Sequence, residues 1–302
     1  MVVFIKANIN HVLDNIKCNL KLEKEIKLKS LILMYYLMTR SDEHTEELTN
    51  KLIEKLSSDD NFRFHDEMYF EFVTNFALQK GVNVSTIIQN YFLEGYLFHT
   101  FNGAFETSIS ENGLILENKP WSLTELEEIR MIFSKHGKQN IFGLYQGEQK
   151  TPIYLSETIA SSAYYAVSSP SWFLHFTTGG MERNHYDKEA FRNRDYESCL
   201  HNIEKLIRDN HLDVLEAQKV LDFFEKYYQI FKNENPSILL VPRASFLNDE
   251  IPQRNLEETD IAYLKRIKNT LASKHLTVKE NISPEQLLII NYNPNKTLKK
   301  DN

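Results

Sequence analysis

The stretch Thr151-Pro-Ile-Tyr-Leu-Ser-Glu-Thr-Ile-Ala-Ser-Ser-Ala-Tyr-Tyr-Ala166 joins a short apolar run to a helical pattern. Residues 151–155 are typical of a strand, and Ser156 is a favourable N-cap for a helix that follows at once. Tyr165 lies eleven positions after Tyr154, with small residues between them. Two aromatic faces could hold a flat ligand, but tyrosines at helical spacing are more often packed in a core. Both interpretations stay open for this stretch alone.

The composition is that of an ordinary globular chain. The 302 residues are 42% hydrophobic and 25% charged, which is ample for a large core in one or two domains. Lys and Arg number 35 against 42 acidic residues, a net charge of −7, and no long basic stripe is present. No nucleic-acid partner is therefore expected. Cys18 and Cys199 indicate no disulfide framework, which fits a reducing compartment.

The apolar segments of the chain are short. The N-terminal run after Met1 is too short for a signal peptide, and the run at residues 31–38 is far below the length of a membrane span. We therefore expect a soluble protein with no membrane partner. It would work in the cytoplasm, or be secreted into a host cell without a cleaved signal peptide.

Residues 1–94 are expected to form a helical N-terminal subdomain. Their amphipathic patterns predict helices at residues 21–38, 42–56, 64–79 and 84–91. Ser41 or Asp42 is the expected N-cap of the second of these helices, and Asn83 or Ser85 that of the last. The subdomain would either support the domain that follows or bind a partner.

From Gly95 to the end of the chain, short strands with interspersed helices are expected to form a second domain, 95–302. Asn112-Gly113 should end its first helix, and Ser122 should cap the next. A helical insertion is expected at about residues 187–233. Because strands and helices do not alternate regularly, the sequence predicts an α+β fold. The predicted strands are 96–101, 141–146, 151–155, 237–241, 275–279 and 286–292, and the predicted helices outside the insertion are 104–111, 122–135, the one after Ser156, and 259–271.

Two segments carry motifs in the order found in a known enzyme family. Phe98-His-Thr100 stands on a strand before a short helix that ends in Asn112-Gly-Leu114, and the later unit contains Ile153-Tyr154 and Ser162-Ala-Tyr-Tyr165. This pattern resembles the ADP-ribosyltransferase fold of the diphtheria-toxin and poly(ADP-ribose) polymerase branch. The resemblance covers about residues 95–293 and implies a split β-sheet core. It leaves out the N-terminal helices and the helical insertion.

The resemblance implies an enzyme with NAD as its co-substrate. Tyr154 and Tyr165 would stack on the two faces of the nicotinamide. Ser162 and the backbone of Thr100 would bind the carboxamide, and His99 would bind ribose hydroxyls. The family has glycine after the histidine, whereas Thr100 has less backbone freedom. A buried imidazole with a structural role is the alternative for His99.

The family also has a glutamate at the start of a late strand, where it stabilises the positive charge that develops on the ribose. Lys274 and His275 occupy the matching positions in this chain. Glu280, at the other end of that strand, is therefore the candidate catalytic acid, with a solvated turn carboxylate as the alternative. Without an acid at the site, single transfers are expected rather than long polymers.

Other motifs add little to this picture. Gln146-Gly-Glu148 precedes the tyrosine unit and is interpreted as a turn. The histidines lack ligand spacing, so no metal is assigned. Arg183 and Arg243 are candidates to meet a pyrophosphate, although ordinary salt bridges are the simpler use for both.

The expected function is mono-ADP-ribosyltransfer from NAD to a side chain of a protein acceptor, as in a bacterial effector that inactivates a host protein. One alternative is an inactive or NAD-hydrolysing member of the same fold, such as a binding module that keeps the slot or a relative of RNA 2′-phosphotransferases. Another is a non-enzymatic α+β interaction protein in which the tyrosines belong to the core.

Overall fold

A computed structural model divides the chain into two compact units. Unit 1 comprises Met1–Leu116, Pro152–Val167 and Asn235–Asn302, and unit 2 comprises Glu117–Thr151 and Ser168–Glu234. The residues that the structure describes are 9, 11–14, 16, 20, 22–58, 66–116, 121–138, 141–142, 153–156, 173, 176–177, 195–232, 236–243, 251–272, 276–278 and 280–291.

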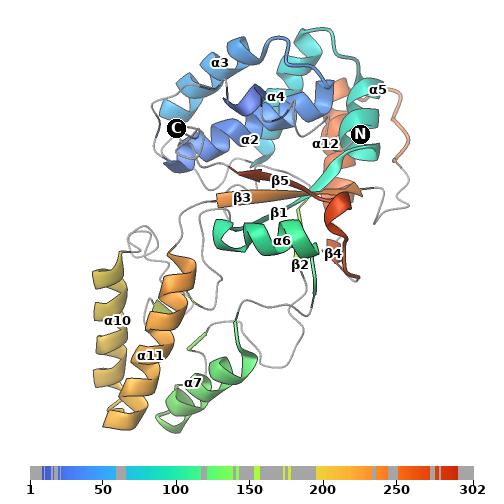
Figure 1. Ribbon diagram of the computed structural model, residues 1–302. Coiled ribbons are helices and arrows are strands. Elements are labelled where there is room, and N and C mark those ends of the chain that lie inside the picture. Colours follow the sequence, from blue (N-terminus) through green and yellow to red (C-terminus); the bar gives the residue numbers. More distant parts are fainter. Residues whose placement is uncertain are drawn as a thin grey trace, which may run out of the picture. The chain divides into compact units, whose positions relative to one another are not determined.

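Helices precede the first strand of unit 1 (Figure 1). Most of them confirm the predicted helices. The second begins at Thr45 rather than Asp42, because the Asp42 carbonyl accepts hydrogen bonds from both the N–H and the hydroxyl of Thr45 and so closes a turn first. Asn83 caps the last by accepting a hydrogen bond from the Thr86 N–H. The bounds are α2 Leu22–Thr39, α3 Thr45–Ser58, α4 Asp66–Gln79, α5 Val84–Ile87 and the π-helix η1 Ile88–Leu93.

Three strands form an antiparallel sheet in the order β1-β3-β5. They are β1 Tyr96–Asn102, β3 Pro236–Pro242 and β5 Leu288–Asn291, and each coincides with a predicted strand. In this register His99 of β1 pairs with Leu239 of β3, which also pairs with Ile289 of β5. Both edges of β3 are therefore paired.

A second, two-stranded antiparallel sheet consists of β2 Ile153–Leu155 and β4 Leu276–Val278. These strands confirm the predictions at residues 151–155 and 275–279. An antiparallel bridge between Phe98 and Ser156 links this sheet to β1. With helices and small antiparallel sheets in one chain, the fold is α+β, as the sequence predicts.

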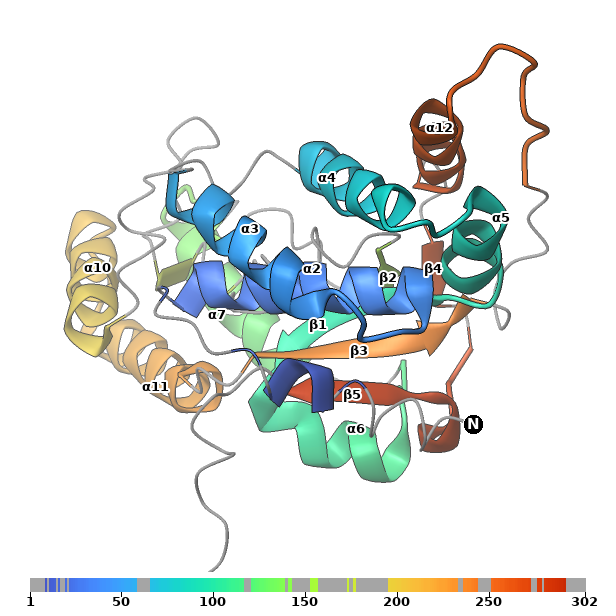
Figure 2. The same ribbon diagram turned by 90° about the horizontal axis from the view of Figure 1, so that it is seen from above.

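The three-stranded sheet is covered on both faces (Figures 1 and 2). Tyr96 and Phe98 of β1 belong to a core that also holds residues of α2, α3, α4, η1 and α12 (Asp260–Ala272). Leu97 and Phe101 belong to a core on the other face, against which Ile109 of α6 (Glu106–Asn112) packs. We call these two sides the helix face and the α6 face.

The boundary between the units differs from the one expected at residues 94 and 95. The N-terminal helices and β1 share a single core, because β1 is apolar on both faces and the helices cover one of them. Unit 2 is instead formed by two segments from within the expected second domain, Glu117–Thr151 and Ser168–Glu234. The second of these includes the expected insertion at 187–233.

The end of α6 is fixed at the predicted Asn-Gly pair. Gly113 is the C-cap with φ +77°, and its N–H donates to the Ile109 carbonyl at 2.9 Å. The next residue, Leu114, forms an antiparallel bridge with Ile282. The chain therefore leaves the helix directly toward the segment before β5. Short 3₁₀ turns, η2 Gly103–Phe105 and η4 Pro284–Gln286, lead into α6 and β5.

Unit 2 contains α7 Leu123–Lys135, α10 Tyr196–Asp209 and α11 Val214–Phe231. The first confirms the predicted helix at 122–135, and the other two lie in the predicted helical insertion. Ser122 caps α7, as predicted. Tyr227 of α11 donates to Glu125 at 2.7 Å and accepts from the Ser122 N–H at 2.8 Å. Burial and the Glu125 carboxylate raise the pKa of Tyr227. The phenol therefore stays neutral and joins α11 to the start of α7.

Candidate functional site

His99 lies in the middle of β1 on the α6 face of the sheet. Successive strand residues point to opposite faces, and the residues two positions away, Leu97 and Phe101, both belong to the α6-face core. His99 is only partly buried, whereas Leu97 is fully buried. The imidazole therefore retains a surface that solvent or a ligand can reach.

The bridge between Phe98 and Ser156 brings the histidine strand to the tyrosine strand. The Phe98 N–H donates to the Ser156 carbonyl at 2.9 Å, and the Ser156 N–H donates to the Phe98 carbonyl at 2.7 Å. Because the bridge is antiparallel, His99 comes beside Leu155 at the end of β2. Segments more than fifty positions apart in sequence thus meet beside His99.

The pairing between β1 and β2 stops at this bridge. Continuing the register would place Thr100 opposite Tyr154, but no bridge joins these two residues, and Tyr154 is paired on its other edge with Thr277 of β4. Among the described residues of β2 and its flank, Ser156 alone is bridged to β1. The ladder between β1 and β2 therefore ends before Thr100 and Tyr154.

The backbone of Thr100 is directed toward the β2 edge, beyond the end of this ladder. Within a strand, the N–H and C=O of alternate residues point to the same edge, and those of Phe98 point to β2. The N–H and C=O of Thr100 consequently point to the β2 edge as well. Its side chain lies on the helix face, the same face as Tyr96 and Phe98, which belong to the helix-face core. The side chain therefore does not obstruct the edge.

Several expected site residues lie outside the residues that the structure describes. They include Ser162 and Tyr165, as well as Lys274 and His275 before β4. For Tyr154 the strand backbone is described but its side chain is not. The structure thus brings together His99, the Thr100 backbone and the strand that carries Tyr154. The stacking of Tyr154 and Tyr165 on the nicotinamide stays a prediction.

Glu280 follows the end of β4 that lies away from the β1–β2 bridge. Leu276 pairs with Leu155 beside the bridge, whereas Val278 pairs with Ile153 at the other end of β2. Glu280 follows Val278 and is exposed, so at about 3.3 Å per residue it lies up to roughly 13 Å along the chain from Leu276. The role of Glu280 as the catalytic acid stays a prediction.

A different carboxylate lies on the same face as His99. Ser237 of β3 is fully buried, and its hydroxyl donates to Glu106 Oε2 at 3.4 Å. Ser237 pairs with Phe101, the residue two positions after His99 on β1. Glu106 is not among the residues that the sequence predicts for the site. The available signal was an acid in the first turn of the helix that directly follows the histidine strand.

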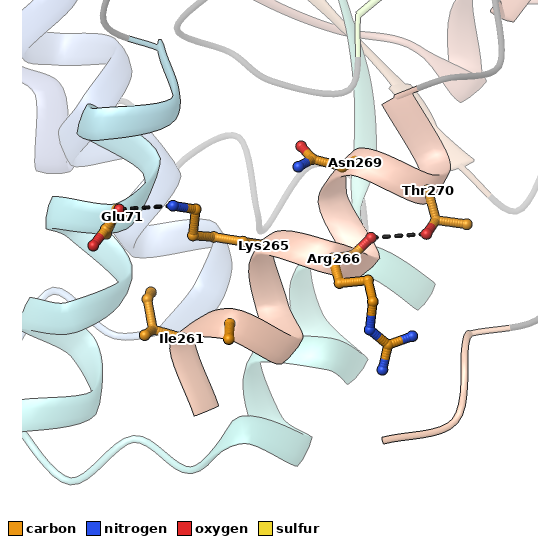
Figure 3. Close-up of a pocket in the computed structure, with 7 residues that line it drawn as sticks. Glu71, Ile261, Lys265, Arg266, Asn269 and Thr270 are labelled. Atoms are coloured by element: carbon orange, nitrogen blue, oxygen red, sulfur yellow. Dashed lines mark hydrogen bonds and ion pairs between the residues drawn. The ribbon is translucent and has the colours of Figure 1, made fainter. Parts of the chain in front are cut away.

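A groove of about 600 Å³ lies between α4 and α12 (Figure 3). Lys265 Nζ contacts Glu71 at 3.0 Å, and Arg266 contacts Glu258 at 2.7 Å, so its cations are already neutralised. Both helices belong to the helix-face core, on the opposite side of the sheet from His99. The groove is therefore separate from the site around His99. It is lined by Glu71, Ile261, Ala262, Lys265, Arg266, Asn269 and Thr270.

Among the described residues, no group of three or more His, Cys, Asp or Glu side chains is arranged to hold a metal ion. Nor does the described part of the chain contain a helix that is both long and apolar enough to cross a membrane. Comparison of the chain with family models, curated proteins and solved structures gives no match.

Proposed function

We propose that this protein transfers ADP-ribose from NAD to a side chain of a protein acceptor. The observation that supports this function is the Phe98–Ser156 bridge, because it sets His99 and the Thr100 backbone beside the strand that carries Tyr154. Two small sheets that meet at β1 are also what a split-sheet core requires. The motif order and the observed pairing thus favour the same fold.

The Thr100 backbone suits a carboxamide. Its N–H and C=O point to the same edge, so the N–H can donate to the amide oxygen and the C=O can accept from the amide nitrogen. The glycine that the family has at this position is not needed for these contacts, because the Thr100 side chain lies on the helix face. His99 is only partly buried, and its imidazole is the proposed contact to a ribose hydroxyl.

The proposed reaction exchanges one bond for another at the ribose. The bond between C1′ and the nicotinamide nitrogen breaks, and its electron pair cancels the positive charge of the pyridinium ring. The nucleophile of the acceptor bonds to C1′ and releases its proton to solvent. The Tyr154 strand and Thr100 would hold the leaving group in orientation, and His99 would hold the ribose. We further propose that the acceptor is a host-cell protein.

The test uses NAD labelled in its ADP-ribose part, with bacterial and eukaryotic cell lysates as sources of acceptor. Wild-type protein should release nicotinamide and label a protein band in the eukaryotic lysate. His99→Ala should lower both rates by about tenfold or more, since it removes a hydrogen bond to the ribose. His201→Ala, on the exposed surface of α10, is the matched control and should leave both unchanged.

Other outcomes separate the alternatives. Nicotinamide release without a labelled protein would assign an NAD hydrolase. NAD binding without release would assign a binding module that retains the slot. Absence of NAD binding by wild-type protein would reject the proposed function and leave an α+β interaction protein.

A further inference from the structure

We propose that two copies of this protein form a two-fold dimer in which Leu256 of each copy enters the α4–α12 groove of the other. Two features of unit 1 support it: the loop at residues 251–259, which precedes α12, and the groove between α4 and α12 (Figure 3). Ile251 at the start of the loop and α12 itself both pack against the helix-face core. The dimer therefore does not depend on the reaction proposed for the other side of the sheet.

Leu256 is the most exposed large apolar side chain among the described residues. Its exposed fraction is 107%, against 84% for Val214, the next highest. Single exposed leucines are common on protein surfaces, so exposure alone carries no conclusion. Two further observations concern Leu256: contacts fix the loop on both sides of it, and the loop adjoins a groove.

The loop is held in place around Leu256. The Arg254 guanidinium contacts Asp260 at 2.6 Å and donates to the Glu258 carbonyl at 2.8 Å. The Asn255 N–H donates to the Glu258 carboxylate, and the Glu258 N–H donates to the Asn255 carbonyl, both at 3.2 Å. A side chain on a backbone that is already ordered loses less conformational entropy when it binds. Leu256 is thus a preorganised anchor.

Arg266 places the loop directly beside the groove. Its guanidinium donates to the Glu258 carboxylate at 2.7 Å and to the Gln253 carbonyl at 2.8 Å, and the same residue lines the groove. Gln253 and Glu258 stand on either side of Leu256 in the loop. The anchor and the groove are therefore adjacent parts of one surface. A two-fold interface requires this arrangement, because each copy must present both parts to the other.

The groove suits an apolar side chain better than an anion. Ile261 and Ala262 supply apolar lining, and the stems of Lys265 and Arg266 add to it. Both cations already contact carboxylates of their own chain, so they do not call for a charged ligand. The volume of about 600 Å³ is larger than one leucine side chain, so the groove can hold Leu256 together with part of its loop.

The carboxylate next to Leu256 also has a possible donor on the facing copy. Glu257 is exposed, and a lysine ammonium has three donors. Lys265 contacts Glu71 at 3.0 Å and Glu67 at 3.4 Å, which accounts for two of them. Glu257 of the facing copy can accept from the third when Leu256 enters the groove.

Sedimentation equilibrium of the full-length protein between about 1 and 100 μM tests the dimer, whose Kd we expect on the order of 10 μM because the interface is small. Leu256→Asp should weaken the dimer about 100-fold or more, since it would place two carboxylates in apolar grooves. Ala262→Trp should weaken it similarly by filling the groove. Val214→Asp, in the exposed first turn of α11, is the matched control and should dimerise like wild type.

The remaining outcomes each contradict the proposal. Wild-type protein that stays monomeric over this range forms no such dimer. A dimer that survives Leu256→Asp uses another surface, and one that survives only Ala262→Trp seats the leucine outside the groove. Growth beyond two copies would mean a head-to-tail contact without a two-fold axis. Because Leu256 is fully exposed, Leu256→Asp should keep the wild-type melting temperature, which separates loss of the dimer from loss of the fold.

Discussion

Glu258 and Arg266 form an ion pair with two contacts beside the start of α12. The Arg266 guanidinium donates from Nε to Oε1 at 2.8 Å and from its terminal nitrogen to Oε2 at 2.7 Å. The Asn255 N–H also donates to Oε2, at 3.2 Å. The hydrogen bonds from Arg266 are the main reason that the pKa of Glu258 lies at about 2, below its ordinary value of 4.5. The folded protein therefore favours the ionised form.

This pKa shift predicts how Glu258 affects stability at different pH. Because the folded pKa is lowered, the stabilisation is complete above about pH 4.5 and is lost as the pH falls through about 2. Glu258→Gln should lower the melting temperature at pH 7 by on the order of 1–3 °C, since the pair is near the surface. Thermal unfolding at pH 7 and pH 3 should show a smaller difference from wild type at pH 3. A difference that is equal at both pH values contradicts the prediction, and Glu257→Gln is the exposed control.

The site residues differ in how far the sequence could identify them. His99 and Tyr154 are predicted from motif order, and both strands form as expected. Thr100 looks unfavourable in place of glycine, and only the strand geometry shows that its side chain is directed away from the β2 edge. Glu280 is predicted only from its proximity in sequence to β4, because the sequence contains no signal for the direction in which β4 pairs with β2. Glu106 depends on a contact with β3, which lies 131 positions away at Ser237.

Helices with strong end signals were predicted well. Ser122 and Asn83 accept the hydrogen bonds expected of N-caps, and Gly113 ends α6. These signals involve residues within one turn of each other, so the sequence contains them directly. The π-helix at Ile88–Leu93 was not predicted, because its apolar pattern also fits an α-helix. Pairing between distant strands likewise left no local signal.

The end of α6 provides a test of the packing that brings α6 beside β5. A Cβ atom on Gly113 would lie 2.1 Å from the backbone oxygen of Ile282, and the residue has φ +77°. Gly113→Ala should therefore lower the free energy of unfolding by about 2–4 kcal/mol, through both strain and displacement of the Leu114–Ile282 bridge.

Gly81→Ala is the matched control for this change. Gly81 has a similar φ of +84°, but no atom of the described structure lies within 4 Å of the added Cβ. Its cost should be about 1 kcal/mol, from backbone conformation alone. Urea unfolding of the two variants measures the difference, and equal losses would show that the contact with Ile282 is unimportant.

Unit 1 is assembled from distant parts of the chain around one sheet. The helix-face core combines N-terminal helices, β1, β3, β5 and α12. The α6-face core contains Leu155 of β2 and Leu114 after α6. Strands β1, β3 and β5 each contribute apolar residues to both cores in alternation, so the sheet links the two cores. The candidate site on the α6 face therefore depends on helices that pack on the other face.

The fragment 95–302 tests this dependence, because it contains every expected site residue but lacks α2, α3 and α4. Without these helices Tyr96, Phe98 and Ile238 lose the core that buries them in the full chain. We expect the fragment to bind a hydrophobic dye and to lack cooperative unfolding of the sheet, while α7, α10 and α11 keep their helical circular dichroism. Addition of the fragment 1–94 should reduce dye binding. If 95–302 alone unfolds cooperatively and binds no dye, the boundary between residues 94 and 95 is a true domain boundary, and the site does not need the N-terminal helices.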